Sequence, residues 1–162
     1  MTSSGVRGFD FLIGSWDVAN RRLRERLAGS TDWEEFPATA ICRRILGGTA
    51  NIDEISFPTR GYTGSTLRLF NAEREEWSLH WSSSLTGRLE PPVVGRFIDG
   101  VGDFFGDDRH EETPIRVHYR WSRITPTSAR WEQAFSTDQE SSWERNWIMD
   151  FTRVVDTVTP AA

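Results

Sequence analysis

The chain has 162 residues and a formal net charge of −5, and all 19 basic residues are Arg, which excludes chemistry that needs Lys. Its single cysteine, Cys42, excludes an intrachain disulfide and a CxxC motif. The acidic balance argues against nucleic-acid binding, and no apolar run approaches the ~20 residues of a membrane helix. Without the features of a secretion signal at its start, the sequence predicts a cytoplasmic protein that binds neither nucleic acid nor membranes.

The residue pattern predicts about ten β-strands and little helix. Apolar, β-branched and aromatic residues recur at alternate positions in segments separated by Gly, Pro, Asn and Asp. Most connections are of hairpin length, and the longest polar one, 106–114, is expected to be a mobile loop. In chain order the predicted strands are 15–27, 33–46, 50–57, 62–71, 76–83, 93–99, 102–105, 115–124, 129–136 and 143–155.

The alternation gives several strands one apolar face. Eight Trp, ten Phe and two Tyr suit a wide interior lined by rings. An antiparallel sheet of this length loses its open edges by closing, and a barrel of eight to ten strands leaves room for one small ligand. The sequence therefore predicts an all-β, up-and-down antiparallel barrel. The residues expected inside it include Trp77, Leu79, Trp81, Val117, Tyr119, Trp121, Trp131, Gln133, Phe135, Trp143, Trp147, Met149 and Phe151, with Asn146 on the opposite face of the last strand.

The segment 9–18, FDFLIGSWDV, places a short apolar turn before Gly14-Ser15-Trp16. This Gly-x-Trp at the first strand resembles the opening signature of the calycin barrels, which are the lipocalins, the fatty-acid-binding proteins and the nitrobindin-like proteins. The resemblance implies a barrel end closed by a 3₁₀ turn, with the Trp packed there beneath a cationic side chain of the last strand. Arg153 matches that cation, and a guanidinium over an indole is attractive.

The chain lacks the second lipocalin motif and the lipocalin disulfide. Segments 9–18, 45–54, 91–97, 129–136 and 143–149 also look like an uncharacterised bacterial family of short β-barrel proteins with no assigned activity. Since no repeat or linker interrupts the sequence, we expect one domain over 1–162. Residues 1–14 would form the plug segment and residues 156–162 a flexible tail.

The function that this architecture favours is binding of a small, largely apolar or aromatic molecule inside the barrel. Gln133 would orient the ligand, and Arg22 would partner a carboxylate or phenolate. A bend or bulge in the first strand would instead turn Asn20 and Arg22 outward. Flat outer strands with aromatic residues are compatible with a homodimer. The candidate ligand-binding residues are Asn20, Arg22, Trp77, Trp81, Tyr119, Trp131, Gln133 and Trp147.

The alternative function is a cofactor-independent isomerase, cyclase or hydrolase. His80, Glu54 and Glu132 are its candidate acids or bases. Period-two alternation, however, puts His80 on the serine side of its strand, which favours a structural role on an outer face. Of the neighbouring carboxylates Asp53 and Glu54, one points inward, and an ion pair with Arg43, Arg44 or Arg68 is the leading interpretation there, with catalysis second.

A third reading is a haem protein of the nitrobindin-like kind, with haem as the only cofactor considered. It needs a histidine that faces the cavity, whereas His118 alternates with inward rings and His110 falls in the polar loop, where solvent exposure is expected. Cys42 is interpreted as a small apolar filler. No metal-ligand spacing, Ser-His-Asp order or phosphate loop is evident, so we predict no metal site.

Overall fold

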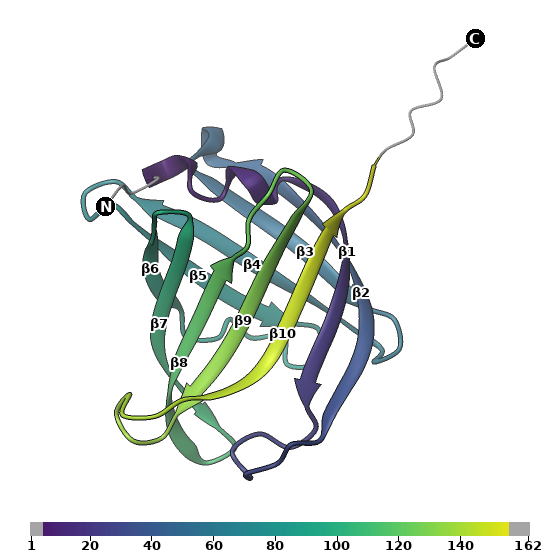
Figure 1. Ribbon diagram of the computed structural model, residues 1–162. Coiled ribbons are helices and arrows are strands. Elements are labelled where there is room, and N and C mark those ends of the chain that lie inside the picture. Colours follow the sequence, from purple (N-terminus) through teal and green to yellow (C-terminus); the bar gives the residue numbers. More distant parts are fainter. Residues whose placement is uncertain (1–4, 156–162) are drawn as a thin grey trace.

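The strands of the computed structural model, which describes residues 5–155, close into one antiparallel barrel (Figure 1). Each strand pairs with the next along the chain, and the last strand pairs with the first. The predicted all-β, up-and-down barrel with a short N-terminal 3₁₀ segment is confirmed. The strands are β1 Gly14–Leu23, β2 Trp33–Ile45, β3 Ala50–Phe57, β4 Tyr62–Asn71, β5 Glu76–Ser83, β6 Val93–Ile98, β7 Val101–His110, β8 Thr113–Ser122, β9 Ser128–Ser136 and β10 Glu144–Arg153, and a further 3₁₀ turn, η3 Leu46–Gly48, connects β2 to β3.

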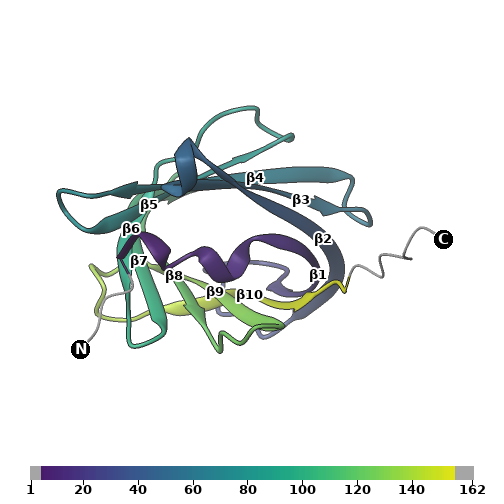
Figure 2. The same cartoon turned by 90° about the horizontal axis from the view of Figure 1, so that it is seen from above.

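One end of the barrel is covered by two short 3₁₀ turns, η1 Gly5–Arg7 and η2 Asp10–Leu12. Seen from above, this segment crosses the opening between the two sides of the sheet (Figure 2). Phe9, which is almost fully buried, packs its ring against Trp77 and Phe97 at centroid distances of 5.0 and 4.8 Å. Residues 5–14 of the predicted plug are thus described, while the predicted tail, 156–162, lies outside the described residues.

Trp16 and Arg153 fasten this plug to the barrel. The indole Nε1 of Trp16 donates to the Leu12 carbonyl at 2.8 Å, and the Arg153 guanidinium lies 4.3 Å from the Trp16 ring centroid. Arg153 also donates to the carbonyls of Phe11 and Ile13, both at 2.6 Å. Gly14, with φ +122°, leaves the room this needs, because a Cβ there would lie 2.5 Å from Arg153 Nη1.

The prediction of a mobile loop over 106–114 is wrong. β7 continues to His110 and meets β8 at Thr113, so that only two residues form the turn, and Glu111 adopts a φ of +55°. Acidic and basic residues hide this strand from a hydrophobic pattern because they pair across the outer face, as Asp107 does with Arg116 at 3.2 Å. β1 also ends earlier than predicted, at Leu23.

A β-bulge changes the face of the first residues of β10. The register with β9 shifts between Arg145 and Trp147, which inserts Asn146 as an extra residue. Asn146 is fully buried, and Trp143 lies on the outside, where its ring contacts His118 at a centroid distance of 5.6 Å. The predicted inward Trp143 and outward Asn146 are therefore both wrong.

β5 and β6 form the least extensively paired neighbours of the barrel. Their register covers three residue pairs, from Trp77–Gly95 to Leu79–Val93, whereas β7 and β8 pair over nine. Beyond Leu79, β5 continues to Ser83 in its pairing with β4, and the connection 84–92 then returns to β6. This connection lies against β5, since the Glu90 N–H donates to the Trp81 carbonyl at 2.8 Å. None of the helices among the described residues is long and apolar enough to cross a membrane.

Candidate ligand-binding cavity

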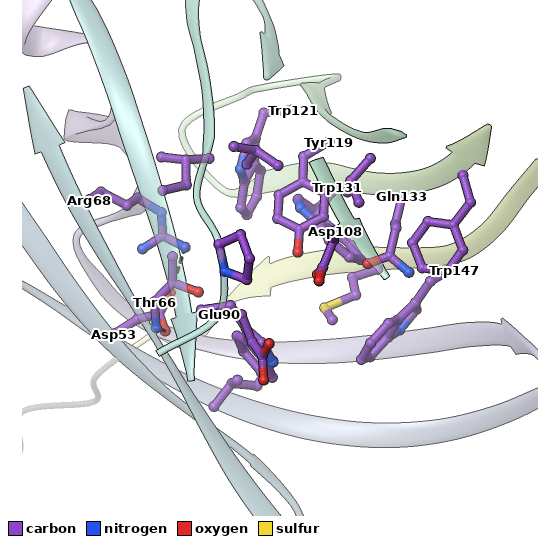
Figure 3. Close-up of a pocket in the computed structure, with 18 of the residues that line it drawn as sticks. Asp53, Thr66, Arg68, Glu90, Asp108, Tyr119, Trp121, Trp131, Gln133 and Trp147 are labelled. Carbon is purple, nitrogen blue, oxygen red and sulfur yellow. Dashed lines mark hydrogen bonds and ion pairs between the residues drawn. The ribbon is translucent and has the colours of Figure 1, made fainter. Parts of the chain in front are cut away.

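A cavity of about 160 Å³ lies inside the barrel (Figure 3). Its wall combines aromatic rings, aliphatic side chains and a few polar groups. A cavity of roughly 150 Å³ accommodates benzene, so this space matches a molecule of about one ring. The lining residues are Ala40, Asp53, Ile55, Thr66, Arg68, Leu79, Trp81, Glu90, Pro91, Val93, Asp107, Asp108, Val117, Tyr119, Trp121, Trp131, Gln133, Phe135, Trp147, Met149 and Phe151.

Three rings on β8, β9 and β10 form a connected aromatic wall. The Trp131 ring lies edge-on to Tyr119 and Trp147, with centroids 5.0 and 5.5 Å apart. Trp147 is held in turn by its Nε1, which donates to Asn20 Oδ1 at 2.9 Å. Rings fixed in this way offer a preformed apolar surface, because their orientation does not have to be ordered when a ligand binds.

Trp81 covers the cavity from β5, and a glycine makes space for it. A Cβ at Gly64 on β4 would lie 1.9 Å from the Trp81 ring. The indole therefore lies flush on the β4 backbone, and Trp81 is half-buried where it lines the cavity. The small residue on one strand determines the position of the large ring on the next.

An ion pair forms the deep polar part of the cavity wall. Arg68 Nη2 donates to Asp53 Oδ2 at 2.6 Å, and Arg68 Nη1 donates to Asn51 Oδ1 at 3.1 Å. Asp53 Oδ1 also accepts the Thr66 N–H at 3.0 Å. The predicted pairing of an inward carboxylate here with a neighbouring arginine is confirmed, and the inward member is Asp53, since Glu54 is exposed.

One donor of Arg68 is unused. Arg68 is only 4% exposed, and its Nε has no hydrogen-bond partner among the described residues. The guanidinium lies 5.3 Å from the Phe9 ring centroid and 5.9 Å from that of Trp121, so Arg68 sits where the plug meets the cavity. Leaving a buried donor unpaired costs about 1–3 kcal/mol, so this N–H lowers the stability of the fold.

Acidic side chains from the connection 84–92 and from β7 complete the cavity wall. Glu90 and Asp108 are half-buried and line the cavity near Tyr119 (Figure 3). Burial raises the pKa of the Tyr119 phenol far above its usual value, and the negative charges of Asp108 and Glu90 raise it further. The phenol therefore stays neutral, as a hydroxyl that can donate or accept.

Gln133 lines the cavity and is one of two buried amides that could act as polar anchors for a ligand. Its Nε2 donates to Asn146 Oδ1 at 2.9 Å, so the bulge of β10 supplies the partner that orients the amide. Asn20 is the other: its Oδ1 is occupied by Trp147, while its buried Nδ2 has no partner among the described residues. The predicted inward orientation of Asn20 is confirmed by its burial, although it does not line the cavity itself.

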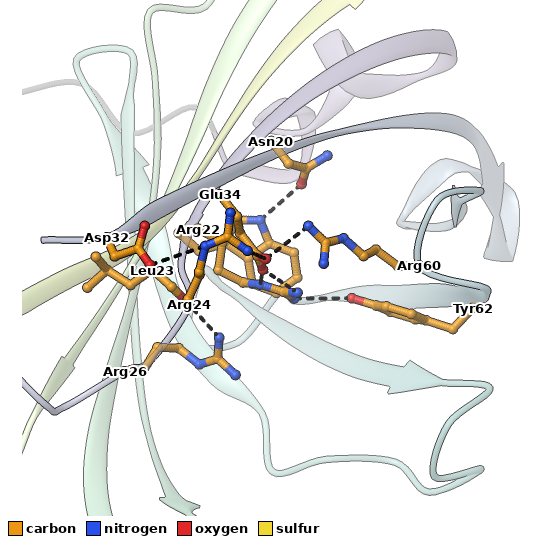
Figure 4. A network of polar contacts seen from close by, with 10 residues as sticks. Asn20, Arg22, Leu23, Arg24, Arg26, Asp32, Glu34, Arg60 and Tyr62 are labelled. Carbon is orange, nitrogen blue, oxygen red and sulfur yellow. Dashed lines mark hydrogen bonds and ion pairs between the residues drawn. The ribbon is translucent and has the colours of Figure 1, made fainter. Parts of the chain in front are cut away.

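Arg22 also faces inward but is already engaged by protein groups (Figure 4). Its guanidinium lies between the rings of Phe36 and Trp147, 4.8 Å from each centroid. Its Nη2 and Nε donate to Glu34 Oε1 at 3.0 and 3.2 Å, and its Nη1 donates to the Tyr62 hydroxyl at 3.4 Å. Arg22 is not among the cavity-lining residues, so it buttresses the back of Trp147 instead.

Glu34 is the centre of this network. Besides Arg22, it pairs with Arg60 at 2.9 Å and with Arg24 at 3.4 Å. Burial raises the pKa of the Glu34 carboxyl, but hydrogen bonds and charge from Arg22 and Arg60 lower it more, and the net direction is down. Glu34 is therefore ionised and, together with its arginines, forms a rigid polar cluster at the barrel end away from the plug.

The remaining predicted site residues lie outside the cavity. Trp77 on β5 contacts the plug, because its Nε1 donates to the Gly5 carbonyl at 3.1 Å. The three candidate acids or bases are on the outer face: His80 contacts Ser78 Oγ at 3.0 Å, Glu132 pairs with Arg145 at 2.9 Å, and Glu54 is exposed. Of the predicted ligand-binding residues, the cavity wall contains Trp81, Tyr119, Trp131, Gln133 and Trp147.

The cavity residues do not fit a haem. A porphyrin joins four five-membered rings, whereas the cavity matches about one ring in volume. His80 and His118 face outward, and His118 is bound to Asp103 at 2.6 Å. His110, which we expected to be solvent-exposed, is half-buried beside the Phe135 ring, at 5.7 Å between centroids, but does not line the cavity.

Two further chemistries find no support. Within residues 5–155, no cluster of three or more His, Cys, Asp or Glu side chains could hold a metal ion. Cys42 is buried, and burial raises the pKa of its thiol to about 11, with a smaller contribution from Asp53. The thiol is therefore neutral at physiological pH and packs as an apolar group.

Together, the fold and the cavity define a closed, ten-stranded antiparallel barrel with one plugged end. No protein-family model and no curated protein matches the sequence. Among solved structures, the chain is similar to the S-type phycobiliprotein lyase CPES from Guillardia theta, with 10% sequence identity and a TM-score of 0.41 over 91% of this chain and 90% of that one. A similarity this low carries no argument about function, and membership of a calycin family stays a prediction.

Proposed function

We propose that the protein binds a small, largely apolar molecule of about one aromatic ring inside the barrel. The observation that carries this proposal is the cavity of about 160 Å³, with aromatic rings on β8, β9 and β10 and the Arg68–Asp53 ion pair in its wall. A largely apolar wall with a few placed polar groups is the usual composition of a small-molecule site.

Titration of intrinsic Trp fluorescence with benzyl alcohol tests the proposal. Trp81, Trp131 and Trp147 line the cavity, so an occupant there should change their emission in a saturable manner. Benzyl alcohol offers one ring for the aromatic wall and one hydroxyl for the polar groups that line the cavity. Absence of a saturable response to benzyl alcohol, toluene and phenol would overturn the proposal.

A matched pair of substitutions locates the binding. Ala40 lines the cavity from β2, and Ala19 is exposed on β1. Ala40→Leu fills part of the cavity and should weaken benzyl alcohol binding by about tenfold or more, because a molecule of one ring has little spare space. Ala19→Leu adds the same atoms outside and should leave binding unchanged. Equal affinities in the two variants would show that the probe binds elsewhere.

A further inference from the structure

The charges around the cavity do not balance. Asp53 is neutralised by Arg68, and Asp107 by Arg116 on the outer side. Glu90 and Asp108 remain: neither carboxylate has an ion pair with an Arg or His side chain among residues 5–155. Asp108 Oδ1 accepts only the N–H of the next residue, Arg109, at 2.8 Å. Counted together with Arg116, the partner of Asp107, the side chains that line the cavity therefore carry an excess of two negative charges.

Both unpaired carboxylates are next to aromatic faces. Glu90 is tied to Trp81 through its own backbone N–H, which donates to the Trp81 carbonyl at 2.8 Å. Asp108, Glu90 and Tyr119 all line the same cavity (Figure 3). Rings and carboxylates together are the environment that organic cations prefer, since the π face and the negative charge both attract them.

The deep end of the cavity does not compensate for this excess. Arg68 is the one cationic side chain that lines it, its charge is matched by Asp53, and what it still offers is the Nε–H donor. The other inward arginine, Arg22, is bound to Glu34 and does not line the cavity. A ligand carboxylate would thus meet two unpaired carboxylates without a free cation. The sequence-based expectation of an anionic ligand held by Arg22 is therefore not supported.

We propose that the ligand is a small organic cation, with its apolar body among Trp81, Tyr119 and Trp131 and its ammonium or amidinium group beside Glu90 and Asp108. This proposal rests on the proposed function and names the chemical class of its ligand. In this arrangement the positive group pairs with the two carboxylates that lack a cation, and the apolar body lies against the aromatic rings.

Three probes of nearly the same shape test the class of ligand: benzylammonium, benzyl alcohol and benzoate. Their dissociation constants are measured by Trp fluorescence and by calorimetry at pH 7 and low ionic strength. We expect benzylammonium to bind about tenfold more tightly than benzyl alcohol, and benzoate more weakly than either. Because Glu90 and Asp108 are half-buried and not fully enclosed, the preference for the cation should shrink as salt is added.

Substitution of the two carboxylates assigns the preference to them. In Glu90→Gln/Asp108→Asn, the ratio of the dissociation constants of benzyl alcohol and benzylammonium should fall from about ten to about one, and saturable binding of benzyl alcohol shows that the cavity is intact. Glu35→Gln removes one negative charge from an exposed position on the outer face of β2 and should keep the preference.

The outcomes separate this inference from the proposed function. Equal binding of benzylammonium and benzyl alcohol by the wild-type protein, or tightest binding of benzoate, would overturn the cation proposal while leaving the cavity as a binding site. A preference that survives in the double variant would also overturn it. Failure of all three probes to bind would overturn the proposed function itself.

Discussion

At the plug end of the barrel, the polar side chains have hydrogen-bond partners, whereas several polar groups around the cavity have none. The Trp16 indole, the Trp77 indole and the Arg153 guanidinium all donate to backbone carbonyls of the N-terminal segment. Around the cavity, Arg68 Nε has no acceptor, and Glu90 and Asp108 have no cationic partner among the described residues. Both regions are rich in aromatic rings, so hydrophobicity alone does not distinguish them.

This difference in hydrogen-bond pairing indicates that the plug contributes to stability and the cavity to binding. A fully paired, densely packed end gains free energy of folding from its rings, and unpaired groups around a void forgo part of that gain. Arg68 lies on the border, because it packs on Phe9 of the plug and lines the cavity as well. If this division is real, substitutions at the plug should change the free energy of unfolding, and substitutions around the cavity should mainly change affinity.

The largest effect is expected for Trp16→Ala. Trp16 is buried, holds the Leu12 carbonyl and contacts Phe151 at 6.0 Å between ring centroids. Loss of a buried Trp should lower the free energy of unfolding by about 3–5 kcal/mol, as measured by urea denaturation followed by circular dichroism. Trp33→Ala is the matched control: this ring is only half-buried at the start of β2, and its loss should cost less than about half as much. Similar losses in the two variants would contradict a specific role for Trp16.

The second effect is expected for Arg153→Met, which keeps the length of the side chain but removes its donors. Arg153 donates to three carbonyls, those of Phe11, Ile13 and Pro126, and lies over Trp16. Hydrogen bonds of a charged donor contribute about 1.5–3 kcal/mol, so we expect a loss of about 2–3 kcal/mol in urea denaturation. Arg43→Met, at an exposed position of β2, is the control and should be nearly neutral. If Arg153→Met lowers the free energy of unfolding no more than Arg43→Met does, the hydrogen bonds of Arg153 do not stabilise the plug.

These two residues could be predicted from the sequence because their signals are local. Gly14-Ser15-Trp16 precedes a regular alternation, and Arg153 ends the last strand, so strand order and chain ends suffice to bring them together. The ring-bearing faces of β5, β8 and β9 were predictable for the same reason. A period of two along a strand assigns its faces without knowledge of its neighbours.

The polar part of the cavity could not be predicted in the same way. The sequence indicated an ion pair between an inward carboxylate, Asp53 or Glu54, and one of three arginines, but it did not single out Arg68, which is buried because Asp53 and Asn51 on β3 hold it. Asp108 lies near the start of the polar run 107–112, which is typical of a loop. Such inward polar residues depend on cross-strand partners, and one sequence does not show which strands pair in which register.

The third effect concerns the cavity and is expected for Gly64→Ala. The added Cβ would meet the Trp81 ring at 1.9 Å, so the indole must swing away from its position over β4. Affinity for benzyl alcohol should fall by about tenfold, while stability falls by only about 1–2 kcal/mol. Gly29→Ala controls for stability alone, because Gly29 has a φ of +68° and no neighbouring atom within 4 Å. Unchanged affinity in Gly64→Ala would show that Trp81 does not shape the binding site.

The smallest effect concerns the outer face, which should belong to neither region. Burial raises the pKa of Asp103, but hydrogen bonds from Arg120 at 2.8 Å and His118 at 2.6 Å lower it more, and the net direction is down. A lowered carboxyl pKa stabilises the fold fully above its ordinary value near 3.8 and loses this contribution as the pH falls through the folded-state value. Because Asp103 is partly exposed, solvent screening limits the effect to less than about 1 kcal/mol. Asp103→Asn should therefore unfold slightly more easily than wild type in urea at pH 7 and match it near pH 2. Its affinity for benzyl alcohol should equal that of the wild type. The control is Asp17→Asn, at an exposed position of β1, which should match wild type in stability at both pH values. A deficit in Asp103→Asn that persists undiminished at pH 2 would show that the charge of Asp103 is not its cause.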